Sequence, residues 1–434
     1  MNIEHDNYLN TIDCQISMWR RRQKKTFLLE PINMEPKSKK AISGGEKYAF
    51  QEAILKALKR WNKRYFKAPV ALEIDLFPTA NDPPAIHTIP KNYLDLLQIP
   101  IRSLNTRRKR LLLEDDRQIR YLAVKYHISG KSGLPSIRLK VAPYTNLLED
   151  ASLLDKALSG DIPDNSAGLS RRHSHSEEWA KRFKDEEEGA SSDAIRELRD
   201  MEKDKTLWVS KFSEDVYEAV REMHLLDAQK ELLGALSLSL RQFLSLISPS
   251  SNDPTEIQGI YAAMRDTMLN PPLAIDLKHS DLKEGESAAF KEAVKQALDD
   301  FKRRANLLMP LKVKVGVTIL YQAPHVGGID LDNLARRIIP FVHEQLQPPS
   351  DNIFTVDVTK IRDAKLKRWF TERRERLRRM PKYSVTHYQI VQLPRLKGDK
   401  KHGFVRLMFG PGDRTSSLWS QLEDAVRSWM DHVR

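Results

Sequence analysis

The chain has very little cysteine and no long, uninterrupted hydrophobic run. Its 434 residues include one cysteine, Cys14, so an internal disulfide and zinc sites built on cysteine spacing are excluded. The first eleven residues are polar and acidic, without the apolar core of a signal peptide. The most apolar long stretch, 232–247, is interrupted by polar residues, and its helical spacing favours a buried helix over a membrane span. These absences predict a soluble, cytoplasmic protein.

The charge balance is basic, with 72 Lys and Arg residues against 59 Asp and Glu residues. The formal net charge of +13 and a pI near 9.5 favour polyanionic partners. Because many basic proteins never contact nucleic acid, this surplus alone is weak evidence for a nucleic-acid-binding function. The length is sufficient for two or three domains.

An acidic motif is the most informative feature. Asp330 and Asp332 stand two residues apart, just before a run of helical spacing that includes Leu334 and Ile338, and Asp351 follows nineteen residues after Asp332. Carboxylates held close together repel each other unless a cation lies between them. Mg²⁺ is bound by one or two carboxylates together with water and substrate phosphate. A turn that caps a helix would explain one aspartate, but not the step to Asp351. The motif therefore points to metal-assisted cutting of nucleic acid.

The D-x-D-N-L motif, a basic residue four positions after its second Asp, and a further Asp before an alternating strand resemble the RusA-type Holliday junction resolvases. In that family three aspartates bind Mg²⁺ and a lysine assists the chemistry. The resemblance implies that Asp330, Asp332 and Asp351 bind Mg²⁺ (or Mn²⁺), with Asn333 orienting the loop. Arg336 takes the lysine position. A guanidinium cannot shuttle a proton, although it can stabilise charge on a transferring phosphate.

The resemblance extends from near Pro272 to Pro411 and includes two further departures. Ser350 stands where the family usually has another Asp. Pro340 is expected to kink or end the helix early.

Two segments of the chain are similar at an offset of 240 residues. Nine of the twenty positions from 45 to 64 are identical to those from 285 to 304. Each segment predicts a long helix (about 45–65 and 286–306) followed by a proline and a strand, at 70–74 in one case and 311–315 in the other. Two amphipathic helices of similar composition would explain the helices alone, but the register persists beyond them. An internal duplication is therefore predicted.

The acidic motif is incomplete in the first copy. Pro90 and Asn92 fall opposite Asp330 and Asp332, while Asp116, preceded by another Asp, falls opposite Asp351. With one carboxylate left of three, the first copy is expected to hold a metal poorly. It is interpreted as a degenerate copy.

The predicted fold class is α+β, with two RusA-like repeats that each form a small mixed β-sheet with packed helices. Residues 159–192 are rich in small and charged residues, which predicts a flexible linker. His173 and His175 fall in this stretch, where a solvated loop is favoured over a metal site. The predicted units are a degenerate repeat (1–155), a flexible linker (156–192), a helical connector (193–265) and a repeat with an intact acidic site (266–434).

A basic insertion spans residues 365–382 and carries nine Lys or Arg residues against two Glu residues. Its apolar residues recur at helical spacing, which predicts an amphipathic helix. The helix could be a solvated face of the protein, or it could contact the phosphate backbone independently of sequence. The candidate contacts are Lys365, Lys367, Arg368, Arg373, Arg374, Arg378 and Arg379.

The leading functional hypothesis is a Mg²⁺-dependent endonuclease that acts on branched or structured DNA, in which the metal activates water and Arg336 neutralises charge on the phosphate. The alternative is a catalytically inactive RusA-like protein that binds nucleic acid or a partner, favoured by the missing lysine. An RNA-directed nuclease is a third option. RusA-type enzymes act as homodimers, so the two halves are expected to form a pseudo-dimer within one chain, or the chain to dimerise again.

Overall fold

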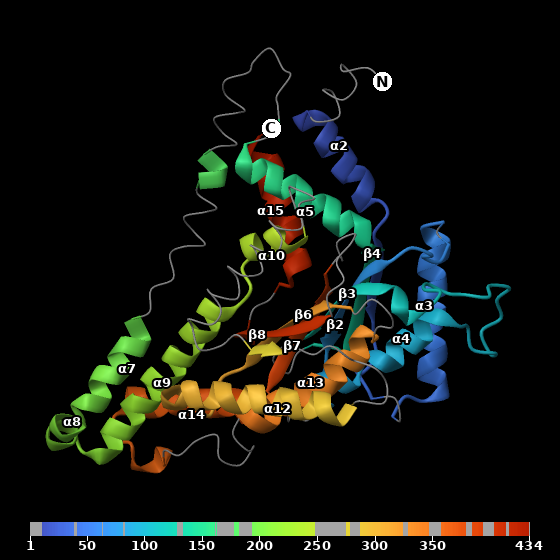
Figure 1. Cartoon of the computed structure of the whole chain (residues 1–434). Coiled ribbons are helices and arrows are strands. Elements are labelled where there is room, and N and C mark those ends of the chain that lie inside the picture. Colours follow the sequence, from blue (N-terminus) through green and yellow to red (C-terminus); the bar gives the residue numbers. More distant parts are fainter. Residues whose placement is uncertain are drawn as a thin grey trace.

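The protein is described by a computed structural model, in which one β-sheet lies between two layers of helices (Figure 1). The structure describes the chain apart from residues 1–10, 39–40, 63, 81–82, 128–132, 161, 163–177, 182–192, 248–274, 278–286, 324–328, 347–356, 379–383, 394–402, 414–415 and 434.

The sheet contains eight strands among the described residues, in the order β1-β4-β2-β3-β7-β6-β8-β5. The strands of the first half of the chain are β1 (Phe27–Ile32), β2 (Val70–Phe77), β3 (Ile119–Tyr126) and β4 (Ser136–Pro143). Those of the second half are β5 (Ile275–Leu277), β6 (Val315–Gln322), β7 (Val385–Gln392) and β8 (Phe404–Pro411). The antiparallel pair β3–β7 joins the two halves at the centre. The two halves therefore form one continuous sheet. The sequence analysis had instead predicted a separate small sheet in each half.

Both halves have the same strand order and the same strand directions. Outward from the centre, β3 is parallel to β2, which is antiparallel to β4, which is antiparallel to β1. In the same way β7 is parallel to β6, which is antiparallel to β8, which is antiparallel to β5. The strands β2 and β6 also share an irregularity. The register of each shifts after its first residue, between Val70 and Ala71 in β2 and between Val315 and Gly316 in β6.

Helices cover the two faces of the sheet because alternate strand residues point to opposite sides. One face packs against α3 (Gly44–Arg60), α4 (Pro90–Gln98), α9 (Glu214–Leu236), α12 (Ser287–Arg304) and α13 (Leu331–Leu346). The other face packs against α2 (Ile12–Gln23), α5 (Tyr144–Ser159), α10 (Leu240–Ile247) and α15 (Leu418–His432). The mixed α+β fold predicted from the sequence is confirmed.

The long helices α3 and α12 form near the predicted ranges. At the start of α3, the hydroxyl of Ser43 accepts a hydrogen bond from the backbone N–H of Glu46, and the Glu46 carboxylate accepts one from the backbone N–H of Ser43. This capping box satisfies backbone donors that a helix end leaves open. Phe50, Ile54 and Leu58 then recur at helical spacing and are buried against the sheet.

The start of one strand and the early end expected of one helix differ from the predictions. The predicted strand at 311–315 is irregular up to Val315, where β6 begins. The helix α13 also continues for six residues after Pro340, up to Leu346. Proline removes one helical hydrogen bond, but Ile338, Ile339 and Val342 are fully buried around it, and this packing holds the helix.

The segment predicted to be a helical connector contains α7 (Asp193–Lys203), α8 (Lys205–Phe212), α9 and α10. In Figure 1, α7 and α8 extend away from the sheet at the lower left. The helix α9 packs on β8, so this segment contacts the second half of the sheet directly. The four-part division of the chain stays a prediction. In the part of the chain that the structure describes, every helix is too short or too polar to cross a membrane.

Candidate metal centre

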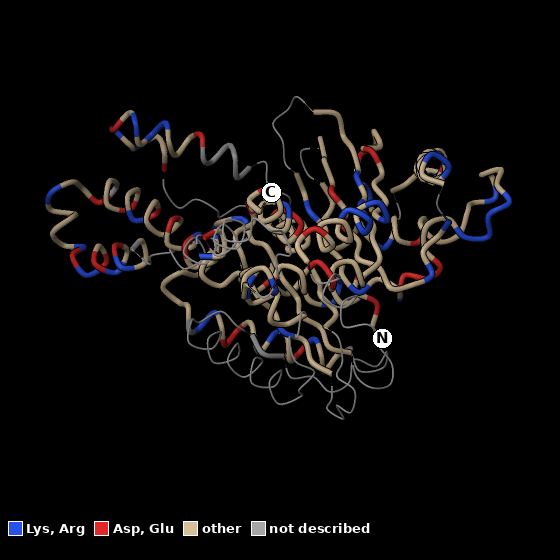
Figure 2. Tube along the Cα trace, turned by 90° about the horizontal axis from the view of Figure 1, so that it is seen from above, with Lys and Arg blue, Asp and Glu red and all other residues tan. Residues whose placement is uncertain are grey.

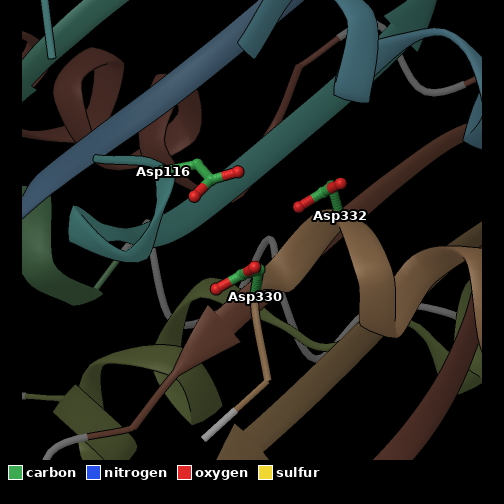
Figure 3. A group of neighbouring side chains, drawn as sticks. All are labelled: Asp116, Asp330 and Asp332. Carbon is green, nitrogen blue, oxygen red and sulfur yellow. The ribbon is translucent and has the colours of Figure 1, made fainter. Parts of the chain in front are cut away.

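Three carboxylates converge where the two halves of the sheet meet. Asp330 and Asp332 lie at the start of α13, in the second half of the chain, and Asp116 begins the short helix η2 (Asp116–Gln118), in the first half. One carboxylate oxygen from each residue lies within 4.8 Å of the others. Figure 3 shows Asp116 on one side and Asp330 and Asp332 on the other, with their carboxylates directed into the same space. The cluster is therefore assembled from both halves of the chain.

Local hydrogen bonds position the elements that carry these aspartates. The Asp115 carboxylate accepts a hydrogen bond of 2.8 Å from the backbone N–H of Arg117 and caps η2. The Asn333 side-chain amide donates a hydrogen bond of 3.3 Å to Asp330 Oδ2. The backbone N–H of Ile329 donates a hydrogen bond of 3.1 Å to the hydroxyl of Tyr321 in β6. Both segments are thus fixed to the framework next to the cluster.

Asp332 is the most unusual member of the cluster. Its exposed fraction is 2%, and neither of its carboxylate oxygens has a hydrogen-bond partner among the described residues. The pKa of Asp332 is raised to about 6: burial is the main cause, the charges of Asp116 and Asp330 add to it, and the charge of Lys91 and the nearby backbone N–H of Asn333 oppose it. Burial also raises the pKa of Asp330, with the charge of Asp116 contributing. A buried carboxylate without a donor is costly, and a bound cation would remove that cost.

Lys91, from the first turn of α4, enters the cluster from the first half. Its Nζ atom lies 2.6 Å from Asp116 Oδ2, 3.7 Å from Asp95 Oδ1 and 3.9 Å from Asp332 Oδ2. Although burial lowers the pKa of Lys91, the hydrogen bond to Asp116 and the charge of Asp332 raise it on balance. Lys91 therefore balances part of the negative charge. At the edge of the cluster, Arg117 Nε lies 3.7 Å from Asp330 Oδ1.

Lys91 and Asp332 are each the second residue of their helix, since α4 begins at Pro90 and α13 at Leu331. The sequence offset of 240 had instead placed Asn92 opposite Asp332. Asn92 is buried, and its side-chain amide donates a hydrogen bond of 3.4 Å to the carbonyl of Lys37, which is a structural contact.

The structure brings together two of the three aspartates predicted to bind metal. Asp330 and Asp332 lie in the cluster, while Asp351 lies outside the described residues. Asp116, which the sequence had assigned to a degenerate copy, is the third member. The signal that could have identified it is the retention of an acidic pair, Asp115 and Asp116, in a half that lacks the other two carboxylates.

Arg336 lies one turn beyond Asp332 on α13, and its side chain is exposed. Burial of His87, together with the charges of Arg336 and His343, lowers the pKa of His87 to about 4.

The predicted basic helix is α14 (Ala364–Arg378). Its apolar residue Phe370 is fully buried against Ala219 of α9 and Val358, and Leu366 and Trp369 pack beside it, so the described part of the predicted apolar stripe packs on the protein. Lys365, Lys367 and Arg368 are exposed, and Arg368 forms an ion pair of 2.9 Å with Glu372. The side chains of the other predicted phosphate contacts lie outside the described residues, namely Arg373, Arg374, Arg378 and Arg379.

In comparisons with known proteins, no protein-family model, curated protein or solved structure matches the chain. The chemistry of the site must therefore be argued from its own residues. Three carboxylates from converging segments form an oxygen donor set that a hard divalent cation prefers. The buried Asp332 carboxylate, which lacks hydrogen-bond donors, fits such an ion.

Proposed function

We propose that the protein is a divalent-metal-dependent endonuclease that acts on branched or structured DNA. The observation that carries this proposal is the convergence of Asp116, Asp330 and Asp332 around a buried carboxylate without hydrogen-bond donors. In this proposal the three aspartates hold Mg²⁺ (or Mn²⁺). When bound, such an ion activates water and stabilises the leaving oxygen of a phosphodiester.

In this proposal the basic residues around the cluster position the carboxylates and supply positive charge. Lys91 holds Asp116 in place through its hydrogen bond of 2.6 Å and partly neutralises Asp332. Arg117, 3.7 Å from Asp330, and Arg336, one helical turn beyond Asp332, add positive charge to the same region of the protein. Positive groups fixed in this way stabilise the charge that develops on a transferring phosphoryl group. Arg336 cannot shuttle a proton, so it contributes charge only.

A RusA-like duplication is the second part of the proposal. The halves share strand order, strand directions and the position of a register shift, which supports descent from one repeated unit. In this view the chain is a pseudo-dimer with one complete acidic site at the junction of its halves. The resemblance of the D-x-D-N-L motif to RusA-type resolvases supports the same view.

One assay tests the proposed activity. Purified protein is incubated with labelled single-stranded, duplex, flap and four-way DNA, and with an RNA of matched sequence, with and without Mg²⁺. The expected result is Mg²⁺-dependent cleavage of branched DNA that is lost in Asp332→Asn. Cleavage that persists in this variant, or that needs no divalent cation, would contradict the proposal. Preferential cleavage of RNA would redirect it to an RNA-directed nuclease.

A second candidate is a RusA-like protein that binds nucleic acid or a partner without cutting. The observation that favours it is the position of Lys91, whose ammonium group already lies among the carboxylates. Isothermal titration with Mg²⁺ and Mn²⁺ separates the two candidates. Tight DNA binding without divalent-cation binding would favour the non-cutting protein.

A further inference from the structure

The connection between α4 and η2, residues 99–115, is a basic segment of the described chain that lies on the same side of the sheet as the metal centre. It carries Arg102, Arg107, Arg108, Lys109 and Arg110. Figure 1 shows it projecting beyond α3 and α4, and Figure 2 shows Lys and Arg positions along it at the edge of the molecule. Arg102, Arg107 and Lys109 are exposed, and none has an acidic partner among the described residues.

The base of this loop is held rigidly. The side-chain amide of Gln51, fully buried in α3, donates hydrogen bonds of 2.9 Å to the carbonyls of Leu96 and Ile99, and its oxygen accepts one of 2.8 Å from the N–H of Ile101. One side chain thus binds three backbone groups, two carbonyls and one N–H, at the end of α4 and the start of the loop. The exposed charges are presented from a defined base.

The other end of the loop is anchored by apolar packing. Leu104 and Leu111 are buried against Leu55 of α3. The backbone N–H groups of Leu111 and Leu112 donate hydrogen bonds of 2.9 Å to the carbonyls of Gln98 and Leu97. Burial and backbone bonding at both ends restrict the loop, so its charges bind with less loss of conformational entropy than those of a free tail.

The loop also leads directly into the metal centre. Arg110 precedes Asp116 by six residues, which span at most about 20 Å even when fully extended. Because a DNA strand advances about 3.4 Å along the axis per nucleotide, a strand whose phosphodiester lies at Asp116 would pass the loop within about six nucleotides. Arg110 also adds to the lowering of the Asp115 pKa, which is caused mainly by the hydrogen bond from the Arg117 N–H.

We propose that residues 99–115 are a phosphate-contacting surface that binds the nucleic acid on one side of the metal centre. This inference rests on the proposed function, because it takes the substrate to be a polyanion that reaches Asp116. Unpartnered Arg and Lys side chains on a fixed loop are complementary to a phosphate backbone and carry no base specificity. Binding through this surface is therefore independent of sequence and sensitive to salt.

The test replaces three charges without touching the cluster. The variant Arg102→Gln, Arg107→Gln, Lys109→Gln is compared with Arg20→Gln, Arg21→Gln, Lys24→Gln, which removes the same charge from exposed positions at the end of α2. This control lies on the opposite face of the sheet from α3 and α4. Fluorescence anisotropy with labelled four-way and duplex DNA in EDTA measures affinity over a series of salt concentrations. Thermal melting checks that both variants fold.

The loop variant is expected to bind DNA at least about tenfold more weakly, with a salt slope reduced by close to three, because each lost phosphate contact removes nearly one released counterion. The control should keep the wild-type slope. Equal affinity and equal slope in the loop variant would overturn the inference. Equally tight, loop-dependent binding of polyglutamate would also overturn it, because the loop would then recognise acidic polypeptide.

Divalent-cation titration separates this inference from the proposed function. The loop variant should bind Mg²⁺ or Mn²⁺ with wild-type affinity, because the three carboxylates are unchanged. Loop-dependent DNA binding by a protein that cuts nothing would leave the inference intact and contradict the nuclease. A wild-type protein that binds no nucleic acid would contradict both.

Discussion

At the scale of single residues, the acidic cluster lowers the stability of the protein when no cation is bound. Asp332 is buried without a hydrogen-bond donor and lies near two other carboxylates. Such a group lowers the stability of the empty protein, as is common where binding sites are pre-organised. Removing its charge should therefore improve folding while it destroys the site.

Asp332→Asn is expected to stabilise the metal-free protein by about 1–3 kcal/mol at neutral pH, because a pKa raised from 3.8 to about 6 corresponds to roughly that cost. The folded state binds a proton at Asp332 that the unfolded chain has released, so wild-type stability falls as pH rises from about 4 to about 6. Urea unfolding in EDTA should show a difference between variant and wild type that grows over this range and is then constant. A difference independent of pH would contradict this assignment.

The composite cluster gives Asp116 a direct part in metal binding. Asp116→Asn is expected to weaken Mn²⁺ binding at least about tenfold, because it removes one of three ligands. Calorimetry on this variant measures the effect, and unchanged Mn²⁺ binding would contradict the assignment of Asp116. Asp351→Asn in the same assay tests the ligand that the RusA-type motif implies, and a comparable loss would make Asp351 a further ligand of the same ion.

Lys91→Met is expected to strengthen Mg²⁺ binding by about tenfold, since an ammonium group 2.6 Å from Asp116 no longer repels the cation. Methionine retains the length and apolar stem of lysine. Lys56→Met is a suitable control, because Lys56 is exposed and its ion pair is with Glu52, one turn away in the same helix. Weaker Mg²⁺ binding in Lys91→Met would mean that Lys91 acts mainly by orienting Asp116.

At the scale of elements, the sequence predicted the helices and strands that local residue patterns determine. It did not predict those whose bounds depend on contacts between distant parts of the chain. The spacing of Phe50, Ile54 and Leu58 predicted α3, because one helical face is buried. The alternation at 311–315 predicted a strand, but the N–H of Leu311 donates to the carbonyl of Leu346 and that of Lys312 to the side chain of Gln229. Those partners lie in α13 and α9, so no local pattern could reveal them.

The same distinction applies to the site. Asp330 and Asp332 share one short motif and could be predicted from it. Asp116 joins them only because β3 pairs with β7 across the centre of the sheet, a contact between strands more than 250 residues apart in the sequence. Lys91 belongs to no recognisable sequence motif, so its contacts with Asp116 and Asp332 could be found only from the structure.

The basic helix α14 carries an element-scale prediction. Changing Arg373, Arg374, Arg378 and Arg379 to Gln should weaken binding to all DNA sequences alike and reduce the salt slope by up to about four. The buried contact of Phe370 is untouched, so folding should be retained. Anisotropy titrations at several salt concentrations measure the effect. An unchanged slope would leave α14 as a solvated face whose apolar side packs on α9.

At the scale of the whole molecule, the proposed nuclease activity predicts one cut for each complete acidic site. One cluster of Asp116, Asp330 and Asp332 occurs in the described part of the chain, where the two halves meet. A monomer with one site is expected to nick one strand of a four-way junction per binding event. Native and denaturing gels of doubly labelled junctions should show nicked junctions accumulating first. Simultaneous cuts in both strands at limiting protein concentration would contradict this and indicate a further dimer.

The pairing of Lys91 with Asp332 has a consequence for how such a chain can evolve. Two identical subunits related by a twofold axis have the same residue at equivalent positions. Where such a position contacts its symmetry mate, the two side chains therefore carry the same charge or no charge. Once two copies are joined in one chain, each position can mutate independently, and two residues related by the former twofold axis can acquire opposite charges. If the halves descend from one repeated unit, as proposed above, the 3.9 Å contact between Lys91 and Asp332 is one that two identical subunits could not make at equivalent positions. In that view, fusion allowed the first half to keep one carboxylate, Asp116, and to add an ammonium group that balances the two carboxylates of the second half.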